Sequence, residues 1–244
     1  MNHLFYILLG IAPSLIWLSF YLRKDAHPEP KKTVLKIFFL GMASAPLAAL
    51  IEKGVENLIS LALPYLPNLA FFFQIFYYFL GVAFVEEYLK YLVVERKYIV
   101  VKNGVLREPE FDEALDVMLY MVIAGLGFAA LENILLFFTK NPPFFEAFLI
   151  ASLRFIGATF LHALCSGILG LFMAFSFFET EKRKVLLFAG FAIAILLHGL
   201  YDFSIIKMRG DLKFLFPLLI LGILAIFVSF GFKKLKGMAS ICKV

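Results

Sequence analysis

Seven long apolar stretches constrain this chain more than any other feature of its sequence. They cover residues 4–22, 33–51, 70–94, 115–138, 145–178, 185–206 and 212–232. A helix needs about 20 mostly apolar residues to cross the hydrocarbon core of a bilayer. The sequence therefore predicts an all-α, polytopic bundle of seven transmembrane helices in the cell membrane. The stretch 145–178 exceeds the required length, so we expect it to tilt, kink or project from the bilayer.

Composition supports a membrane-embedded chain. Hydrophobic residues make up 62% of the 244 residues and charged residues only 17%, with a mean hydropathy of +0.91. We expect one integral-membrane domain over residues 1–244, with a catalytic core at about 70–206. The segment 95–112 is charged and contains Asn103-Gly104, which is a turn signal. Cys165 and Cys242 predict no disulfide framework.

The positive charges predict how the bundle is oriented. Arg23 and Lys24 follow the first apolar stretch and no Lys or Arg precedes it, so we interpret this stretch as a retained helix rather than a signal peptide. Sixteen Lys and Arg residues lie in or beside the connections after the first, third and fifth helices and in the C-terminal tail, against five at the other connections. This places the N-terminus outside and the C-terminus in the cytoplasm. The net charge of +5 then faces anionic lipid, and we expect no nucleic-acid partner.

Eight ionisable residues interrupt the apolar stretches. They are Glu86, Glu87, Lys90, Glu132, Arg154, His162, His198 and Asp202. A charge at bilayer depth costs about 2.5–3.5 kcal/mol on insertion scales, so such residues usually pair inside the bundle or line a water-filled cavity. Helical spacing places Lys90 beside both Glu86 and Glu87, and His198 beside Asp202. Small residues such as Gly125 and Gly127 would let the helices approach closely.

Two histidines and several carboxylates in a dry bundle favour hydrolytic chemistry. His162 and His198, with Glu132 or Asp202, could ligate a catalytic zinc, which commonly takes three N or O ligands and leaves a position for water. Glu86 or Glu87 could take the proton of that water. In a metal-free alternative, glutamate activates water and histidine stabilises the oxyanion. The sequence has no HExxH pair, GxSxG elbow or Walker-type loop, which removes the common zincin, serine hydrolase and nucleotide-driven classes.

Helix counting does not place these groups at one depth. At about 1.5 Å per residue, Glu86 and Glu87 lie roughly 10–12 Å from the cytoplasmic ends of their helix. The same count puts Glu132, His162 and His198 about 20–25 Å from that side. The sequence leaves open whether boundaries, tilt or a funnel explains the offset.

Four motifs, in order on successive helices, resemble the PrsW family of intramembrane proteases. They read EEYLK (86–90), GLGFAALEN (125–133), RFIGATFLHALCSGILG (154–170) and HGLYD (198–202). The segments DAHPEP (25–30) and DVMLY (116–120) also look like that family. The resemblance covers roughly residues 12–203 and extends to the superfamily of CAAX-proteases and bacteriocin-processing enzymes. It implies cleavage of membrane-anchored protein substrates; founding members of the family cut a membrane-anchored anti-sigma factor.

The resemblance also implies that Glu86, Glu87, Glu132, His162 and His198 are catalytic or metal-binding, with Asp202 supporting His198. Together with the chemistry above, we predict that Glu86 and Glu87 are catalytic and that the metal, expected to be zinc, is held by Glu132, His162, His198 and Asp202. Lys90, Asn133 and Arg154 are predicted to be supporting residues. In the superfamily the second motif is commonly of F-x-x-x-H type, whereas Phe128 is followed here by Glu132. This departure leaves the ligand set open, because a carboxylate and an imidazole differ in charge and metal preference.

Two other functions remain compatible with the same residues. Buried Glu, His and Asp also build proton relays, so a proton- or cation-coupled transporter is an alternative. Transporters often carry paired repeats and broken helices at matching positions, which are not visible in this sequence. A noncatalytic membrane chaperone or lipid-binding scaffold is the third possibility. The sequence does not indicate the oligomeric state.

Overall fold

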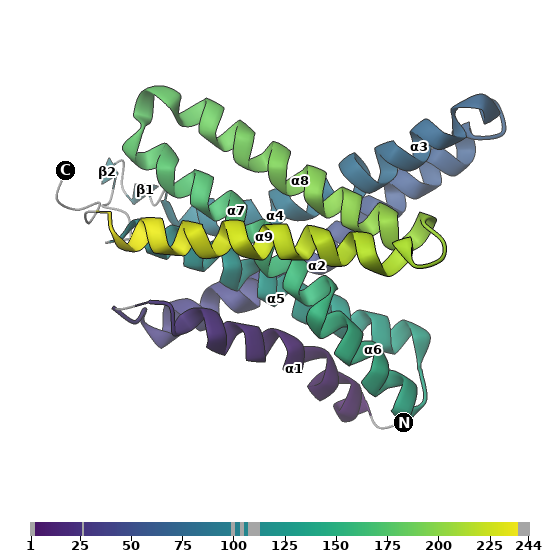
Figure 1. Cartoon of the computed structure of the whole chain (residues 1–244), viewed down its shortest axis with the longest axis horizontal. Coiled ribbons are helices and arrows are strands. Elements are labelled where there is room, and N and C mark those ends of the chain that lie inside the picture. Colours follow the sequence, from purple (N-terminus) through teal and green to yellow (C-terminus); the bar gives the residue numbers. More distant parts are fainter. Residues whose placement is uncertain (1–2, 26, 99–100, 103–104, 107–112, 239–244) are drawn as a thin grey trace.

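The protein is a multi-pass helical membrane protein. The computed structural model of the chain describes residues 3–25, 27–98, 101–102, 105–106 and 113–238. Within these residues, seven helical segments are long and apolar enough to cross a membrane, which confirms the predicted number. Helix α9 extends along the horizontal long axis in Figure 1, with α1 below it in that view. The predicted outside and cytoplasmic sides stay a prediction.

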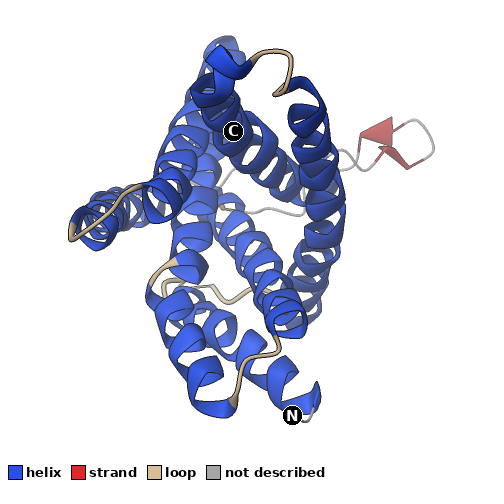
Figure 2. Cartoon of the chain, turned by 90° about the vertical axis from the view of Figure 1, so that its right-hand side faces the viewer, coloured by secondary structure: helices blue, strands red, loops and turns tan. Residues whose placement is uncertain are grey.

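The first three membrane segments contain six helical elements. The first two are α1 (His3–Leu22) and α2 (Lys31–Ala62). The third segment consists of η1 (Pro67–Leu69), α3 (Ala70–Phe76), the π-helical η2 (Tyr77–Phe84) and α4 (Val85–Tyr98). A short antiparallel hairpin of β1 (Val101–Lys102) and β2 (Val105–Leu106) follows and projects from the bundle (Figure 2). The predicted turn residues Asn103 and Gly104 lie outside the described residues, as does Cys242.

The last four membrane segments begin after the hairpin. They are formed by α5 (Ala114–Lys140), α6 (Phe144–Ile156) with α7 (Ala158–Phe178), η3 (Thr180–Lys182) with α8 (Arg183–Lys207), and α9 (Leu212–Lys236). The long predicted stretch 145–178 is thus kinked, because its helix breaks at Gly157 between α6 and α7. A Cβ at Gly157 would lie 2.5 Å from the hydroxyl of Tyr201, so only glycine fits at this break.

Helix α2 is longer than the sequence predicted. The expected span ended at Ile51 because Glu52 and Lys53 interrupt the apolar pattern, whereas the helix continues to Ala62. The side chains of Lys53 and Glu56 form an exposed ion pair of 2.6 Å one turn apart, which is compatible with a continuous helix. The extension places Glu52 inside a membrane segment.

Helix α5 forms the centre of the bundle. Every residue from Ala114 to Ala130 is buried, as expected for a helix that is apolar on all sides. Helices α1, α2 and α7 pack around it. Glycines permit the close approaches: a Cβ on Gly127 would overlap the carbonyl oxygen of Phe38 on α2, and a Cβ on Gly125 would lie 2.8 Å from the carbonyl oxygen of His162 on α7. Gly125 thereby sets the spacing between α5 and the helix that carries His162.

Candidate functional site

The predicted polar residues meet where α4, α5, α7 and α8 pack together. Glu86 and Glu87 lie in the first turn of α4, directly after the π-helical η2. A π-helical turn alters which face the following residues present, and such turns are frequent at functional sites. Glu86 lies close to both His162 on α7 and His198 on α8, and Glu87 contacts His198. These contacts place all four groups at one level, so the depth offset from helix counting does not exist in the folded chain.

Lys90 is the central cation of this cluster and is completely buried. Its Nζ donates to Glu87 Oε1 at 2.9 Å and to Glu86 Oε2 at 3.2 Å, so both pairs predicted from helical spacing are confirmed. A third contact was not predicted: Nζ lies 2.8 Å from His162 Nδ1 on α7. Because an ammonium group only donates, Nδ1 of His162 must be the acceptor here.

His162 connects Lys90 to a second carboxylate. Its Nε2 lies 2.8 Å from Glu132 Oε2, and since Nδ1 accepts from Lys90, Nε2 carries the proton and donates. Glu132 Oε2 also pairs with Arg154 Nη2 at 2.7 Å. Arg154 Nε donates to the side-chain oxygen of Asn133. Arg154 thus contacts the carboxylate that pairs with His162, and Asn133 contacts Arg154.

The Asn133 amide is itself anchored. Its Nδ2 donates to Thr159 Oγ1 at 3.0 Å and to the carbonyl oxygen of Gly10 at 3.3 Å. Asn133 is buried and belongs to α5, whereas Thr159 belongs to α7 and Gly10 to α1. This side chain therefore links three helices beside the site.

His198 is held by two carboxylates. Its Nδ1 lies 2.9 Å from Glu87 Oε1, and its Nε2 lies 3.4 Å from Asp202 Oδ2, so the predicted His198–Asp202 pair is confirmed. Ser166 Oγ lies 3.5 Å from the other oxygen of Glu87. When Nδ1 carries the proton and donates to Glu87, Nε2 presents its lone pair on the side of Glu86, 3.7 Å away.

Three buried donors form a group that fits a metal ion. Glu86, His162 and His198 each offer a ligand atom, and these atoms lie within 4.8 Å of one another. Glu86 Oε2 is 3.6 Å from His162 Nδ1 and 3.7 Å from His198 Nε2. Ligands of a tetrahedral zinc, at 2.0–2.1 Å from the metal, would be separated by about 3.4 Å. The set of two imidazoles and one carboxylate therefore suits a divalent metal, provided that Lys90 releases His162 Nδ1.

The sequence-predicted ligands Glu132 and Asp202 do not belong to this group of three donors. Glu132 contacts Nε2 of His162, opposite the nitrogen that faces Glu86, which is where a carboxylate orients a ring. Asp202 contacts Nε2 of His198, the same nitrogen that faces Glu86. Their side chains are 37% and 26% exposed, whereas Glu87 is fully buried. Glu132 and Asp202 lie in the C-terminal halves of α5 and α8.

Glu52 is a site residue that the sequence analysis missed. It is partly buried on α2 and close enough to interact electrostatically with Glu86 and Glu132. Its Oε1 is buried and has no hydrogen-bond partner among the described residues. The signal was present in the apolar residues Leu58, Ile59 and Leu61, which continue the helical pattern beyond the predicted end of α2 at residue 51.

A second acidic group lies away from this cluster. The resemblance segments DAHPEP and DVMLY meet in space, since Asp25, Glu29 and Asp116 each offer an oxygen within 4.8 Å of the others. The hydroxyl of Tyr120 donates to Glu29. Acidic groups of this kind are common without a metal.

Comparison with known proteins assigns this arrangement to a family. A family model described as PrsW family intramembrane metalloprotease matches residues 29–231. The chain belongs to the PrsW family. Its match places all of the clustered residues from Glu86 to Asp202 inside the family region.

Three PrsW proteases are among the similar proteins. Protease PrsW of Geobacillus kaustophilus is 31% identical over 198 residues, which cover 81% of this chain and 78% of that protein. Protease PrsW of Bacillus subtilis is 29% identical over 234 residues, which cover 95% and 94%. Protease PrsW of Oceanobacillus iheyensis is 29% identical over 212 residues, which cover 87% and 88%. No solved structure matches the chain.

Membership of the PrsW family supports an intramembrane peptidase as the activity of this chain. It disfavours the transporter alternative, which rested on the same buried residues. The family match does not assign catalytic steps to individual residues, so these roles are inferred below from the geometry of the cluster.

Proposed function

We propose that this PrsW-family chain hydrolyses peptide bonds of membrane-anchored proteins with a water molecule activated by Glu86. The observation that carries the proposal is the convergence of Glu86, His162 and His198 inside the bundle. A carboxylate beside two imidazoles can take a proton from water and deliver it to the leaving amine.

The two adjacent glutamates have different contacts, and we infer different roles for them from this difference. Glu87 is enclosed, because Lys90, His198 and Ser166 all contact its oxygens. It therefore positions His198. Glu86 makes a longer contact with Lys90, and its Oε2 faces both imidazoles at 3.6 and 3.7 Å. Glu86 is thus the better placed of the two to accept the proton of a water in that space.

The two imidazoles border the space in which the scissile carbonyl would lie. Their ring centroids are 5.2 Å apart with the planes nearly perpendicular, at 80°. In the tautomers described above each neutral ring presents a lone pair to this space, so a ring protonated on both nitrogens would be the one to direct an N–H at the oxyanion of the tetrahedral intermediate and stabilise it. Glu132 on His162 and Glu87 on His198 hold each ring in place through its other nitrogen.

Glu86, His162 and His198 are also the residues that would hold a metal, with zinc the expected ion. Bound there, a divalent metal would polarise the carbonyl and lower the pKa of a water ligand. Glu132 would then orient the His162 ligand through the other nitrogen of its ring.

The proposed substrate class follows from the location of the cluster. The reacting groups lie among membrane-spanning helices, so the scissile bond must enter the bilayer or its immediate surface. A single-span protein, such as an anti-sigma factor, meets this requirement. We propose that it approaches from the side of Glu132 and Asp202, the more exposed part of the cluster.

Cleavage of a single-span substrate in proteoliposomes tests the role of Glu86. Glu86→Gln should lower the rate by about 10²–10⁴-fold, the range for losing a general base. Glu56→Gln is the matched control, because Glu56 is a half-exposed partner of Lys53 on α2 and should leave the rate unchanged. Unaltered cleavage by a folded Glu86→Gln protein would remove Glu86 from the mechanism.

Metal content decides between the two versions of the chemistry. Elemental analysis of active, detergent-purified protein should find one divalent metal per chain, and His162→Ala should lose it. A fully active protein without metal, insensitive to chelators, would establish the metal-free version, in which Glu86 and the two imidazoles act alone.

A further inference from the structure

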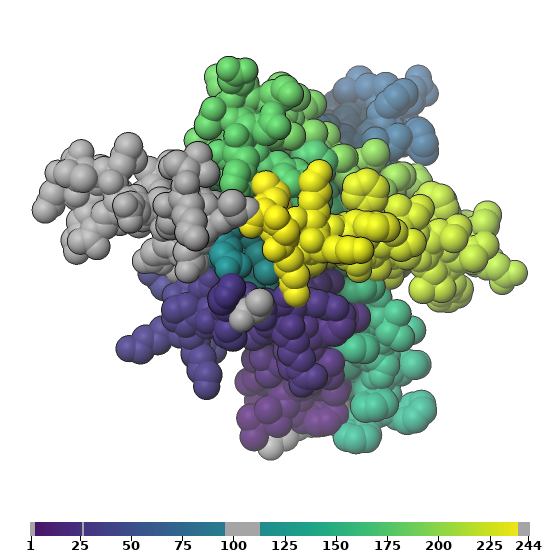
Figure 3. Space-filling view, turned by 60° about the vertical axis from the view of Figure 1, so that its left-hand side comes forward, coloured from purple at the N-terminus to yellow at the C-terminus, as the bar shows by residue number. Residues whose placement is uncertain are grey.

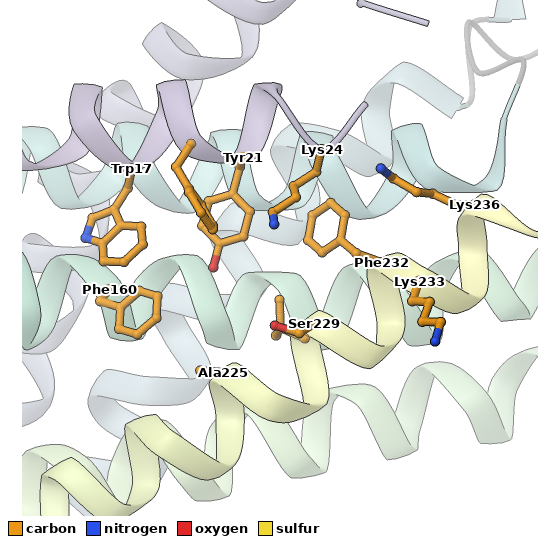
Figure 4. A pocket seen from close by; sticks show the side chains of 11 residues that line it. Trp17, Tyr21, Lys24, Phe160, Ala225, Ser229, Phe232, Lys233 and Lys236 are labelled. Carbon is orange, nitrogen blue, oxygen red and sulfur yellow. The ribbon is translucent and has the colours of Figure 1, made fainter. Parts of the chain in front are cut away.

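A groove of about 500 Å³ lies between α1 and α9, apart from the polar cluster. In Figure 3, yellow α9 crosses this face above purple α1. Figure 4 shows the groove, with Trp17 and Phe160 at one end and three lysines toward the other. The lysines are Lys24, Lys233 and Lys236. The groove therefore has an apolar end and a cationic end.

Aromatic side chains build the apolar end. The rings of Trp17 and Phe160 are stacked with centroids 4.1 Å apart, and those of Tyr21 and Phe232 with centroids 5.6 Å apart. Trp17 Nε1 donates to the carbonyl oxygen of Phe155 at 2.9 Å, which fixes the indole. With the indole nitrogen satisfied, this end offers an apolar surface that suits an acyl chain better than water.

The cationic end lies where both helices finish. Lys24 follows the last residue of α1, and Lys233 and Lys236 belong to the last turn of α9. Among the described residues, none of the three lysines has a carboxylate within ion-pair distance. Lys24 Nζ instead lies 4.6 Å above the ring of Phe20. Three cations next to an apolar slot match a ligand with an anionic head and a hydrocarbon tail.

We propose that this α1–α9 groove binds an anionic phospholipid. Its acyl chain would lie against Trp17 and Phe160, and its phosphate would lie among Lys24, Lys233 and Lys236. Both helices span the membrane, so a lipid can enter the groove laterally from the bilayer. In the predicted orientation the lysines face the cytoplasmic leaflet, where anionic lipids are concentrated. A free phosphate would leave the aromatic slot unfilled, so the groove favours the lipid.

Trp17 provides a direct test because it is the only tryptophan in the chain. Its fluorescence would be recorded in phosphatidylcholine nanodiscs that contain a small fraction of lipid brominated on the acyl chain. Brominated phosphatidylglycerol should quench Trp17 at a several-fold lower fraction than brominated phosphatidylcholine. Equal quenching by the two lipids would overturn the proposal, and so would relief of phosphatidylglycerol quenching by millimolar inorganic phosphate.

Variants distinguish lipid binding in the groove from a general electrostatic attraction between the protein and anionic lipid. Each Lys→Gln change among Lys24, Lys233 and Lys236 should weaken the phosphatidylglycerol preference about fivefold, the contribution of one cation near an anionic surface. Ser229→Phe, which fills the groove without changing charge, should abolish it. The matched control is Lys31→Gln, Lys32→Gln and Lys184→Gln together, which removes three cations predicted on the same side but outside the groove. Loss of the preference in this control would contradict a specific site.

Discussion

The polar cluster has an inner half around Glu87 and Lys90 and an outer half around Glu132 and Arg154. The two halves differ in how deeply their charged side chains are buried. In the inner half, Glu87 and Lys90 are completely buried and contact each other, while Lys90 also contacts His162 and Glu87 also contacts His198. In the outer half, the Glu132 and Arg154 side chains are 37% and 17% exposed. A buried ion pair is costly to break, whereas a partly exposed pair is screened by water. The inner half therefore holds its geometry more firmly than the outer half.

The largest expected effect is the removal of the inner cation. Lys90→Met would leave Glu86 and Glu87 buried without their shared cation, and should lower the free energy of unfolding by about 3–5 kcal/mol. Denaturation in detergent, followed by circular dichroism, measures this. The control is Lys53→Met on α2, which breaks an exposed pair and should cost less than about 1 kcal/mol. Similar losses in the two variants would erase the proposed distinction between buried and exposed cations.

Two carboxylates that each contact a histidine give a matched comparison of the two halves. Glu87→Gln removes a buried charged acceptor and should lower the free energy of unfolding by about 1.5–3 kcal/mol. Glu132→Gln affects a side chain more than a third exposed and should lower it by less than about 1 kcal/mol. The same denaturation measurement applies. The comparison between inner and outer halves fails when Glu132→Gln is the more damaging of the two.

Arg154→Ala should affect activity more than stability. The guanidinium holds Glu132, and Glu132 holds His162, so its loss should lower the cleavage rate about 10–100-fold, as for other groups that orient a catalytic histidine. Stability should change by about 1 kcal/mol or less because the pair is partly exposed. Arg154→Lys, which keeps the charge, should recover part of the rate. No recovery would indicate that the arginine serves only to pack α6.

The smallest expected effect belongs to Asp202. His198 is already held by Glu87 at 2.9 Å, and its contact with Asp202 is longer, at 3.4 Å. Asp202→Asn should therefore change the free energy of unfolding by less than about 0.5 kcal/mol and the cleavage rate only a few-fold. A loss of cleavage as large as that for Glu86→Gln would move Asp202 from an orienting residue to a reacting or metal-binding one.

Contacts within one helix could be predicted from the sequence. Lys90 with Glu86 and Glu87, and His198 with Asp202, follow from helical spacing alone, because a helix places residues three and four apart on one face. Contacts between helices could not be predicted in the same way. Lys90 and His162 are 72 residues apart, and nothing in either segment specifies which face of α7 turns toward α4.

The end of α2 and the break at Gly157 also could not be predicted from the sequence alone. The charged pair Glu52-Lys53 ended the predicted second helix too early, because a helix that leaves the bundle core tolerates charges that a buried helix would not. Because the predicted helix ended at residue 51, Glu52 was not considered among the site residues. The sequence predicted a kink only as one of three ways to accommodate the long stretch 145–178, and the close approach of Tyr201 explains why the residue at the break is a glycine.

The sequence by itself determined a bundle of seven membrane helices and the identity of its buried charges, since apolar length and the cost of intramembrane charge are properties of the chain. Tertiary structure alone decided that Glu86, rather than Glu132 or Asp202, joins His162 and His198 in one group of three donors. The reason is geometric: the rotation and depth of each helix follow from how glycine-lined faces pack around α5, and these packing relations link residues far apart in the sequence.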